Sequence, residues 1–269
     1  SHAPGGVVAL ADQLGLTNLS HMNSTDYGGS TYVGMLGDAA RTIQAGQATA
    51  VLVIMAGIPR HAGRTVRIPA DLANYEQAHG STLISQYAQV ATRHMALYGT
   101  TREDLAQIKV TSAYHASFNP NAFLQKRVTL EEVLDQPPMS WPLHRMDCCV
   151  TTDGGGAYIV VNEEIAKSLG TNCPGILAQE MTSRNWANGG VDLMTTGATI
   201  TGPRALAAAG LKHSDIDYAS IYDSFTITVL KTIEDLGFAE PGKGAALVKD
   251  GGLQAPFGRT RDTGDAQVA

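Results

Sequence analysis

The strongest constraint on the fold is the apolar run ATAVLVIMAG at residues 48–57. An uninterrupted run of this kind is typical of a strand that is buried on both faces, as in the sheets of α/β proteins. It follows residues 30–46, which have helical periodicity and end on Gly46. Residues 17–24, TNLSHMNS, precede that helix and are interpreted as a strand. Strand, helix and strand in this order predict a right-handed crossover between parallel neighbours.

Composition and charge exclude several classes of protein. With 29 glycines and 16% charged residues, the 269-residue chain fits an α/β interior better than a helical bundle. A net charge of −6 without lysine- or arginine-rich runs argues against nucleic acid as a partner. No apolar stretch is long enough for a membrane span and no signal-peptide pattern opens the chain, so we expect a cytoplasmic protein. Three cysteines, two of them adjacent, do not suggest a disulfide framework, and no zinc motif is present.

The remainder of the chain alternates between a helical region and further α/β units. Residues 61–145 are predicted to be mainly helical, with Thr-x-x-Asp and Thr-x-x-Glu capping boxes starting at Thr101 and Thr129. Strands are expected at 150–162, 174–181 and 215–222, and helices at the end of 196–211 and from 224 to Gly237. Because the chain starts and stops abruptly, we expect it to be part of a longer protein.

Tyr222, in the phrase ASIYDSFT, lies where a predicted strand gives way to a predicted helix. In α/β sheets, ligands bind at the carboxyl ends of strands, so this tyrosine either lines a site or closes a core. Asp223 or Ser224 is expected to cap the helix. Gly28 and Gly29 form a second strand-to-helix turn, which lacks the lysine of a phosphate-binding P-loop.

Several long phrases of the chain resemble the thiolase superfamily, in particular its sterol-carrier-protein-x and lipid-transfer branch. The matching phrases are AARTIQAGQATAVLVIMAG, YAQVATRHMALYGTTREDLAQIKVTSAYHASFNPNAF, PLHRMDCCVTTDGGGAYIVV, TGPRALAAAGLKHSDIDYASIYDSF and LGFAEPGKG. The resemblance implies an α/β fold of five layers, αβαβα, with two similar halves and an inserted, mainly helical loop domain. Residues 1–60 and 146–173 would form the N-terminal half, incomplete at its start. Residues 61–145 would form the loop domain, and 174–269 the C-terminal half, incomplete at its end.

Two departures from the thiolase pattern carry the functional interpretation. The nucleophilic cysteine of thiolases aligns with Gly29 or, in another register, with Asp26, and neither residue can form an acyl-enzyme. The family phrase His-Asp-x-Phe is replaced by Tyr222-Asp223-Ser224-Phe225. Both changes resemble the cysteine-free, thiolase-like aldolases of bacterial steroid side-chain degradation, which share the Tyr-Gly-Gly turn.

The resemblance therefore implies retro-aldol cleavage of a branched β-hydroxyacyl-CoA. The catalytic candidates are Tyr222, Tyr27 and Asp223, and the backbone amides of Gly28, Gly29 and Ser30 are candidates for an oxyanion site. Weaker candidates for substrate binding are His115 and Arg204, with Arg64 and Arg67 plausible by charge and position.

The resemblance also implies coenzyme A as part of the substrate, no tightly bound cofactor and no metal, a homodimer, and a small OB-fold partner protein that carries part of the acyl-CoA site. Two alternatives stay open. One is a cysteine-dependent 3-oxoacyl-CoA thiolase whose nucleophile is Cys148 or Cys149. The other is a non-catalytic subunit that binds acyl-CoA or lipid.

Overall fold

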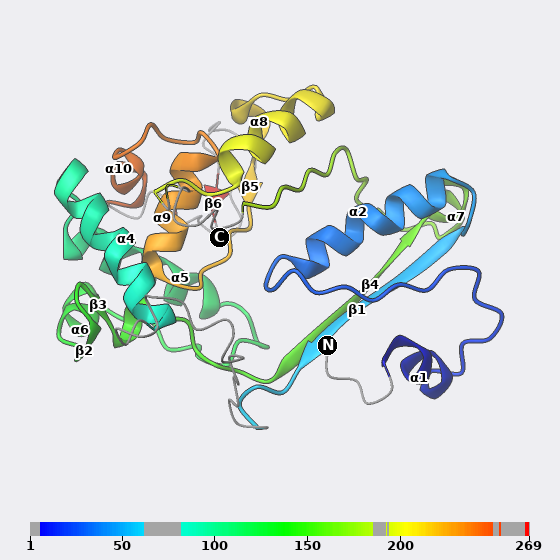
Figure 1. Cartoon of the computed structure of the whole chain (residues 1–269), viewed down its shortest axis with the longest axis horizontal. Helices are drawn as coiled ribbons and strands as arrows, with labels where there is room; N and C mark the ends of the chain where they lie inside the picture. Colours follow the sequence, from blue (N-terminus) through cyan, green and yellow to red (C-terminus); the bar gives the residue numbers. More distant parts are fainter. Residues whose placement is uncertain are drawn as a thin grey trace. The chain divides into compact units, whose positions relative to one another are not determined.

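The computed structural model describes residues 6–61, 82–184, 192, 194–249, 253 and 267–268. By their contacts, residues group into two compact units. Unit 1 comprises Ser1–Thr65 and Thr151–Met181, and unit 2 comprises Val66–Val150 and Thr182–Ala269. Figure 1 labels the helices and strands of both units. The division into two thiolase-like halves and a loop domain stays a prediction. Within the described ranges, no helix has the length and apolar character needed to cross a membrane.

Unit 1 is built on a pair of long strands. Strand β1 (Ala50–Gly57) pairs antiparallel with β4 (Gly154–Val161), with Ala50 opposite Val161 and Gly57 opposite Gly154. Helix α2 (Thr31–Gln44) packs on this pair, and α1 (Gly6–Gln13) and α7 (Glu163–Ser168) complete the described helices of the unit (Figure 1). The long apolar run thus forms a strand, as predicted, but the strand is not buried on both faces, because Val53 is its one buried residue. Helix α2 ends before Gly46, whose φ of 70° favours glycine.

The predicted parallel crossover at the start of unit 1 is wrong. Residues 17–24 form no strand with any residue that the structure describes, and the partner of β1 is the antiparallel β4. Residues 174–181 likewise form no ladder in the described structure. A strand requires a neighbour for its N–H and C=O groups. In the 17–24 segment a side chain supplies a tertiary contact instead, since the Ser20 hydroxyl donates to the Gln47 carbonyl at 2.7 Å.

The first two helices that the structure describes in unit 2 have starts that are set by local side chains. Helix α4 spans Leu83–Tyr98 and α5 spans Arg102–Ala116. The predicted capping box of α5 is confirmed, because Thr101 and Asp104 exchange side-chain-to-backbone hydrogen bonds. The box of α6 (Leu130–Leu134) forms in the same way between Thr129 and Glu132.

The rest of unit 2 consists of short elements around one central helix. The strands are β2 (Pro138–Ser140), β3 (Leu143–His144), β5 (Tyr218–Ala219) and β6 (Gln267–Val268), and the short 3₁₀ helices are η2 (Arg145–Asp147) and η4 (His213–Asp215). The helices are α8 (Ala198–Ala209), α9 (Thr226–Asp235) and α10 (Gly244–Val248). The strand predicted at 215–222 is therefore real but shorter, and it pairs in parallel with β6.

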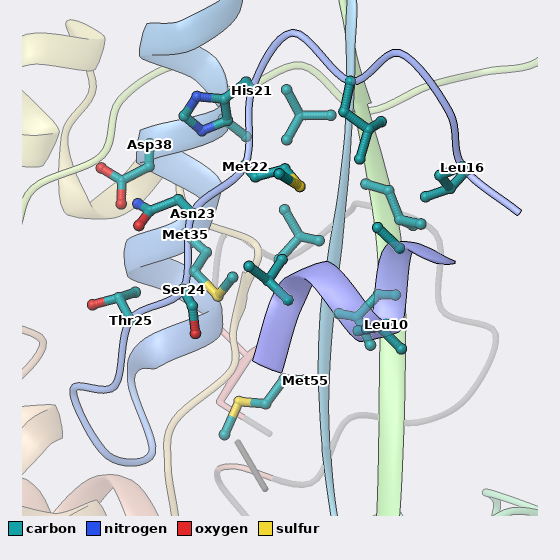
Figure 2. A pocket seen from close by; sticks show the side chains of 18 of the residues that line it. Leu10, Leu16, His21, Met22, Asn23, Ser24, Thr25, Met35, Asp38 and Met55 are labelled. Atoms are coloured by element: carbon teal, nitrogen blue, oxygen red, sulfur yellow. The ribbon is translucent and has the colours of Figure 1, made fainter. Parts of the chain in front are cut away.

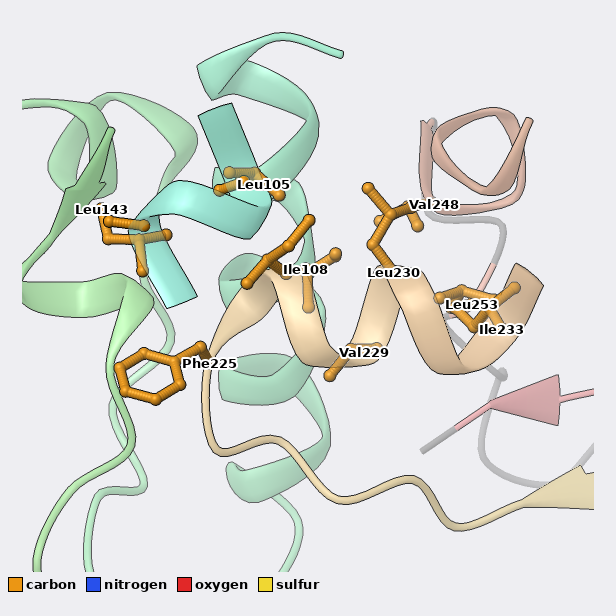
Figure 3. Close-up of a cluster of buried hydrophobic side chains, with 12 residues drawn as sticks. Leu105, Ile108, Leu143, Phe225, Val229, Leu230, Ile233, Val248 and Leu253 are labelled. Carbon is orange, nitrogen blue, oxygen red and sulfur yellow. The ribbon is translucent and has the colours of Figure 1, made fainter. Parts of the chain in front are cut away.

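Helix α9 forms the centre of the unit 2 core (Figure 3). Its Ile227, Leu230 and Ile233 are at most 1% exposed, and they pack with Leu105 of α5 and Val248 of α10. Each fully buried aliphatic side chain of this kind contributes about 1.5–3 kcal/mol of transfer free energy. This packing fixes α9, and with it the segment that leads into its first turn.

The remaining faces of α9 are also buried, and they carry charge. Glu234 Oε2 lies 3.0 Å from His94 Nε2 and 3.1 Å from Lys231 Nζ, and all three residues are at most 4% exposed. Burial alone would raise the pKa of the Glu234 carboxyl. The hydrogen bond and charge of His94, the amide of Gly242 and the Lys231 ammonium outweigh burial and lower the pKa to about 2. The network therefore holds an ionised carboxylate in the core.

Candidate active site

The turn that precedes α2 in unit 1 is held by its own neighbouring residues. The Gly28 amide donates to Asp26 Oδ1 at 2.9 Å. Thr31 Oγ1 accepts from the Tyr27 amide at 2.8 Å and donates to the Gly28 carbonyl at 2.7 Å. Gly28 has a φ of 73°, which a residue with a side chain rarely adopts. Every one of these contacts spans four residues or fewer.

These hydrogen bonds reduce the number of backbone amides that are available for the predicted oxyanion site. The Gly28 amide is already engaged by Asp26, whereas Gly29 and Ser30 are exposed at the N-terminus of α2. A helix N-terminus favours negative charge because its first amides lack intrahelical partners. An oxyanion role for Gly28, Gly29 and Ser30 stays a prediction, with the last two better placed than the first.

Tyr27 lies against α2. An added Cβ on Gly34 would come within 3.1 Å of the Tyr27 ring. The ring can therefore pack against α2 at this point because residue 34 has no side chain. Tyr27 is 47% exposed. The first turn of α2 has a second support from β4, where the Tyr158 hydroxyl donates to the Tyr32 carbonyl. A catalytic role for Tyr27 stays a prediction.

A cavity of about 400 Å³ adjoins this turn in unit 1 (Figure 2). Its walls are α1, the segment 16–28, α2 and β1, and its apolar lining includes Leu10, Met22, Met35 and Met55. Residues 50–56 all line it, so the cavity is not confined to one face of β1.

In unit 2, the phrase Tyr222-Asp223-Ser224-Phe225 connects β5 to α9, as the sequence predicted for a strand-to-helix boundary. Tyr222 is 61% exposed, and Asp223 is also exposed. The predicted helix cap is wrong. The N-cap residue is Phe225, without a side-chain cap, and Ser224 Oγ instead pairs with Thr228 Oγ1 at 2.9 Å. The helix starts one residue later than a Ser224 cap would place it.

Residues 147–149 clamp this turn from a distant part of the sequence. Thr226 Oγ1 donates to Asp147 Oδ1 at 2.9 Å, and the Cys149 amide donates to the Ser224 carbonyl at 3.0 Å. Between these contacts, Cys148 forms an antiparallel bridge with Phe225. The Phe225 ring packs on Tyr87, with ring centroids 4.3 Å apart. Residues 224–226 are thus fixed while Tyr222 and Asp223 remain exposed.

A cavity of about 240 Å³ opens beside the clamped turn. Asp223, Thr226 and the segment 146–150 line one side, and Lys109 and Ser112 of α5 are among the residues on the other. Tyr222, His115 and Arg204 are not among its lining residues. Sequence reasoning missed Asp147, Thr226 and Lys109. The only signal for Asp147 was its place beside the two cysteines in RMDCC.

The adjacent cysteines differ in their surroundings. Cys148 is partly buried, and its Sγ lies 3.5 Å from the His144 carbonyl. Burial, the negative charge of Asp147 and neighbouring Cys149 raise the pKa of the Cys148 thiol to about 11. A thiol with that pKa is almost fully protonated near neutral pH and is a poor nucleophile. Cys149 and Cys173 are exposed.

The weaker substrate-binding candidates lie elsewhere in unit 2. His115 is in the last turn of α5, as predicted, and its Nε2 lies 3.1 Å from the Leu253 carbonyl. Arg204 is exposed on α8. Their roles in binding stay predictions. Arg64 and Arg67 lie outside the described residues.

Known proteins with similar sequences identify the family. Residues 178–260 match the thiolase C-terminal domain-like family. The chain is 31% identical over 268 residues to a steroid side-chain-cleaving aldolase of Thermomonospora curvata, covering 92% of this chain and 68% of that protein. The chain belongs to the thiolase superfamily. It is also 33% identical over 223 residues to an acetyl-CoA acetyltransferase of Methanothermobacter thermautotrophicus, covering 81% of this chain and 56% of the relative.

A solved structure supports the same assignment. The Ltp2-ChsH2(DUF35) aldolase matches with a TM-score of 0.82 and 29% identity over 94% of this chain and 69% of that chain. The predicted α/β thiolase fold is confirmed, and with it the resemblance drawn from the sequence phrases. The chain spans 56% to 69% of the length of four of the curated or solved relatives that it matches, and about half of others. The relatives thus include both an acetyltransferase and a side-chain-cleaving aldolase.

Proposed function

We propose that this thiolase-superfamily chain belongs to an enzyme that cleaves a carbon–carbon bond of a branched β-hydroxyacyl-CoA by a retro-aldol reaction. The observation that carries the proposal is the absence of a cysteine at the position of the thiolase nucleophile. The position of the thiolase cysteine is occupied by Gly29 or, in the other register, by Asp26, and the pKa of the Cys148 thiol is raised to about 11. A retro-aldol reaction needs no acyl-enzyme and therefore no thiolate.

The reaction needs a base and a group that stabilises an enolate. The base removes the proton of the tertiary β-hydroxyl, and the bond between Cα and Cβ then breaks to release a ketone. The bonding electrons move to the thioester as an enolate, which takes up a proton at Cα and leaves as the shortened acyl-CoA. Neither water nor free CoA is consumed. We assign the proton transfers to the Tyr222 phenol, beside Asp223, on the turn before α9.

Two structural properties support this assignment. The turn before α9 is fixed by the clamp at 147–149, so an exposed phenol and carboxylate are presented from a rigid base. Preorganised groups of this kind lower the barrier because they do not reorganise during the reaction. The cavity lined by Asp223, Thr226 and Lys109 offers space next to the Asp223 carboxylate for part of the substrate. The family resemblance, and no contact between the two turns, is the basis for assigning the amides of Gly29 and Ser30 to the enolate oxygen.

The proposal includes a second protein and a dimer. The solved neighbour is an aldolase composed of Ltp2 and ChsH2(DUF35), so we propose that a small OB-fold partner of the ChsH2 kind contributes to the acyl-CoA site here. Coenzyme A enters as part of the substrate. A steroid or other branched lipid side chain is the proposed acyl group, following the relatives that cleave steroid side chains.

The test uses the full-length protein, with and without the candidate partner, and detects products by mass spectrometry. One set of reactions contains a β-hydroxyacyl-CoA with a tertiary alcohol, and another contains a 3-oxoacyl-CoA. Each set is run with and without free CoA. A variant with all three cysteines replaced by serine is the matched control for thiol chemistry.

The proposal predicts a ketone and a shortened acyl-CoA without free CoA, at an unchanged rate in the variant with the three cysteines replaced by serine. Cleavage of the 3-oxo substrate alone, dependent on free CoA and on Cys149, would contradict it in favour of a thiolase. Binding of acyl-CoA without any cleavage, with the partner present, would identify a non-catalytic subunit instead.

A further inference from the structure

Asp147 lies at the base of the turn that carries Tyr222 and Asp223, although 79 residues separate it from Thr226 in sequence. We infer that Asp147 is a positioning residue, which holds this turn in its reactive geometry through the hydroxyl of Thr226. The inference rests on the proposed function. It adds a role for a buried carboxylate that acts on the turn through the Thr226 hydroxyl.

The contacts of Asp147 connect two segments. Asp147 is 2% exposed, and its two carboxylate oxygens have different donors. Oδ1 accepts from Thr226 Oγ1 at 2.9 Å, and Oδ2 accepts from the His144 amide at 2.8 Å. The hydrogen bond from the His144 amide fixes Asp147 relative to its own segment. The hydrogen bond from Thr226 then fixes the first residue of α9 relative to Asp147. A buried carboxylate with satisfied oxygens makes strong, directional hydrogen bonds.

The position of the carboxylate also suits its charge. Helix α9 has no side-chain cap of its own at Phe225, and Asp147 brings a negative charge to the first turn of the helix. Negative charge is stabilised at a helix N-terminus. Asp147 therefore supplies the negative charge that a capping Asp would bring to this helix N-terminus, although it comes from another segment of the chain.

Asp147 has a second consequence for the adjacent thiol. Its charge contributes to the raised pKa of Cys148, whose backbone bridges Phe225. Burial is the main cause of that raised pKa, and the carboxylate that holds the turn adds to it. Both effects depend on the charge, so a neutral amide of the same size should weaken both together.

Four variants of the full-length protein test this role. Thr226→Val removes the hydroxyl donor at nearly constant volume, and Thr226→Ser restores a hydroxyl. Asp147→Asn removes the charge, and the double variant combines Asp147→Asn with Thr226→Val. The matched control is Asp104→Asn, because Asp104 is also buried, at 5% exposed, and its Oδ2 accepts from the Thr101 amide three residues upstream.

Hydrogen exchange, followed by mass spectrometry on the protein without substrate, reports the turn directly. We expect faster exchange at residues 221–226 in Thr226→Val and Asp147→Asn. In Thr226→Ser and Asp104→Asn, exchange at these residues should be the same as in the wild type. Unchanged exchange in both of the first two variants would overturn the inference. This readout needs no turnover, so it separates failure of the clamp from failure of the proposed reaction.

Kinetics on the aldol substrate supply the second readout. We expect kcat to fall about tenfold to a hundredfold in Thr226→Val and in Asp147→Asn, in line with the loss of a buried hydrogen bond to a charged group, with KM nearly unchanged. The double variant should be no worse than the poorer single variant, because both act through one contact. Additive losses in the double variant, or an equal loss in Asp104→Asn, would show a general effect on stability and overturn the inference.

Discussion

The turns before α2 and α9 are held in opposite ways. The turn of unit 1 depends on contacts of four residues or fewer, among Asp26, Gly28 and Thr31. The turn of unit 2 depends on contacts with a segment more than 70 residues away, made by Asp147 and Cys149. The first kind can form as soon as its helix forms. The second requires the core of unit 2 to be complete, so its geometry is tied to global folding.

The largest effect expected from this comparison concerns the buried charges of α9. Glu234→Gln should lower the free energy of unfolding of unit 2 by about 2 kcal/mol, because buried Lys231 loses the carboxylate at 3.1 Å and keeps that of Asp235 at 3.4 Å. The turn before α2 should keep its hydrogen-exchange rates. Denaturant unfolding with exchange by mass spectrometry measures both. The control is Glu163→Gln, which breaks an exposed ion pair with Lys167 and should leave stability unchanged within error.

The same carboxylate gives a pH dependence of known sign. The pKa of Glu234 is lowered to about 2 in the folded protein, below its ordinary value of 4.5. Its contribution to stability is therefore complete above about pH 4.5 and is lost as the pH falls toward about 2. Wild type should lose more stability than Glu234→Gln over this interval. Parallel curves for the two proteins would show that the carboxylate is not stabilised in the fold.

A smaller effect, on the alkylation rate of Cys148, tests whether the segment 147–149 packs against Phe225. With a pKa of about 11, roughly one Cys148 thiol in a thousand is ionised at pH 8. Iodoacetamide should therefore modify exposed Cys149 and Cys173 long before Cys148, by about a hundredfold in rate. Peptide mass spectrometry over time measures the order. Equal rates for Cys148 and Cys149 would mean that the segment 147–149 is not packed against Phe225 as the structure has it.

The smallest effect is expected in the locally held turn. Thr31→Val removes one acceptor and one donor from the turn before α2 and should cost about 1 kcal/mol of stability in unit 1. Faster exchange should be confined to the amides near Tyr27 and Gly28. Spread of the change into α9 would break the distinction between the two turns.

Features held by local contacts could be predicted from the sequence, whereas features held by distant contacts could not. Capping boxes at Thr101 and Thr129, and the glycine that ends α2, were predictable because each depends on residues three or four apart. The cap of α9 was not, since Ser224 bonds Thr228 and the negative charge comes from Asp147. The strand predicted at 17–24 fails for a related reason, because strand formation depends on a neighbour that local pattern does not specify.

The candidate site divides similarly. Tyr222 and Asp223 could be proposed from their place between strand and helix together with the family resemblance. The cavity beside them could not, because Lys109 and Thr226 come from separate elements and neither stands out in its own phrase. Family likeness identified the motif, and tertiary contacts identified what holds it.

The most direct test of cysteine-free aldol cleavage is the activity of Tyr222→Phe in the full-length protein with its partner. Tyr218→Phe is the matched control, because Tyr218 lies four residues upstream and is equally exposed at 61%. Release of ketone from a tertiary β-hydroxyacyl-CoA, without free CoA, would be followed by mass spectrometry. Loss of the phenol should lower kcat at least about a hundredfold, as expected for a general acid–base residue, while Tyr218→Phe keeps the wild-type rate. Ketone release at the wild-type rate by Tyr222→Phe would contradict the account.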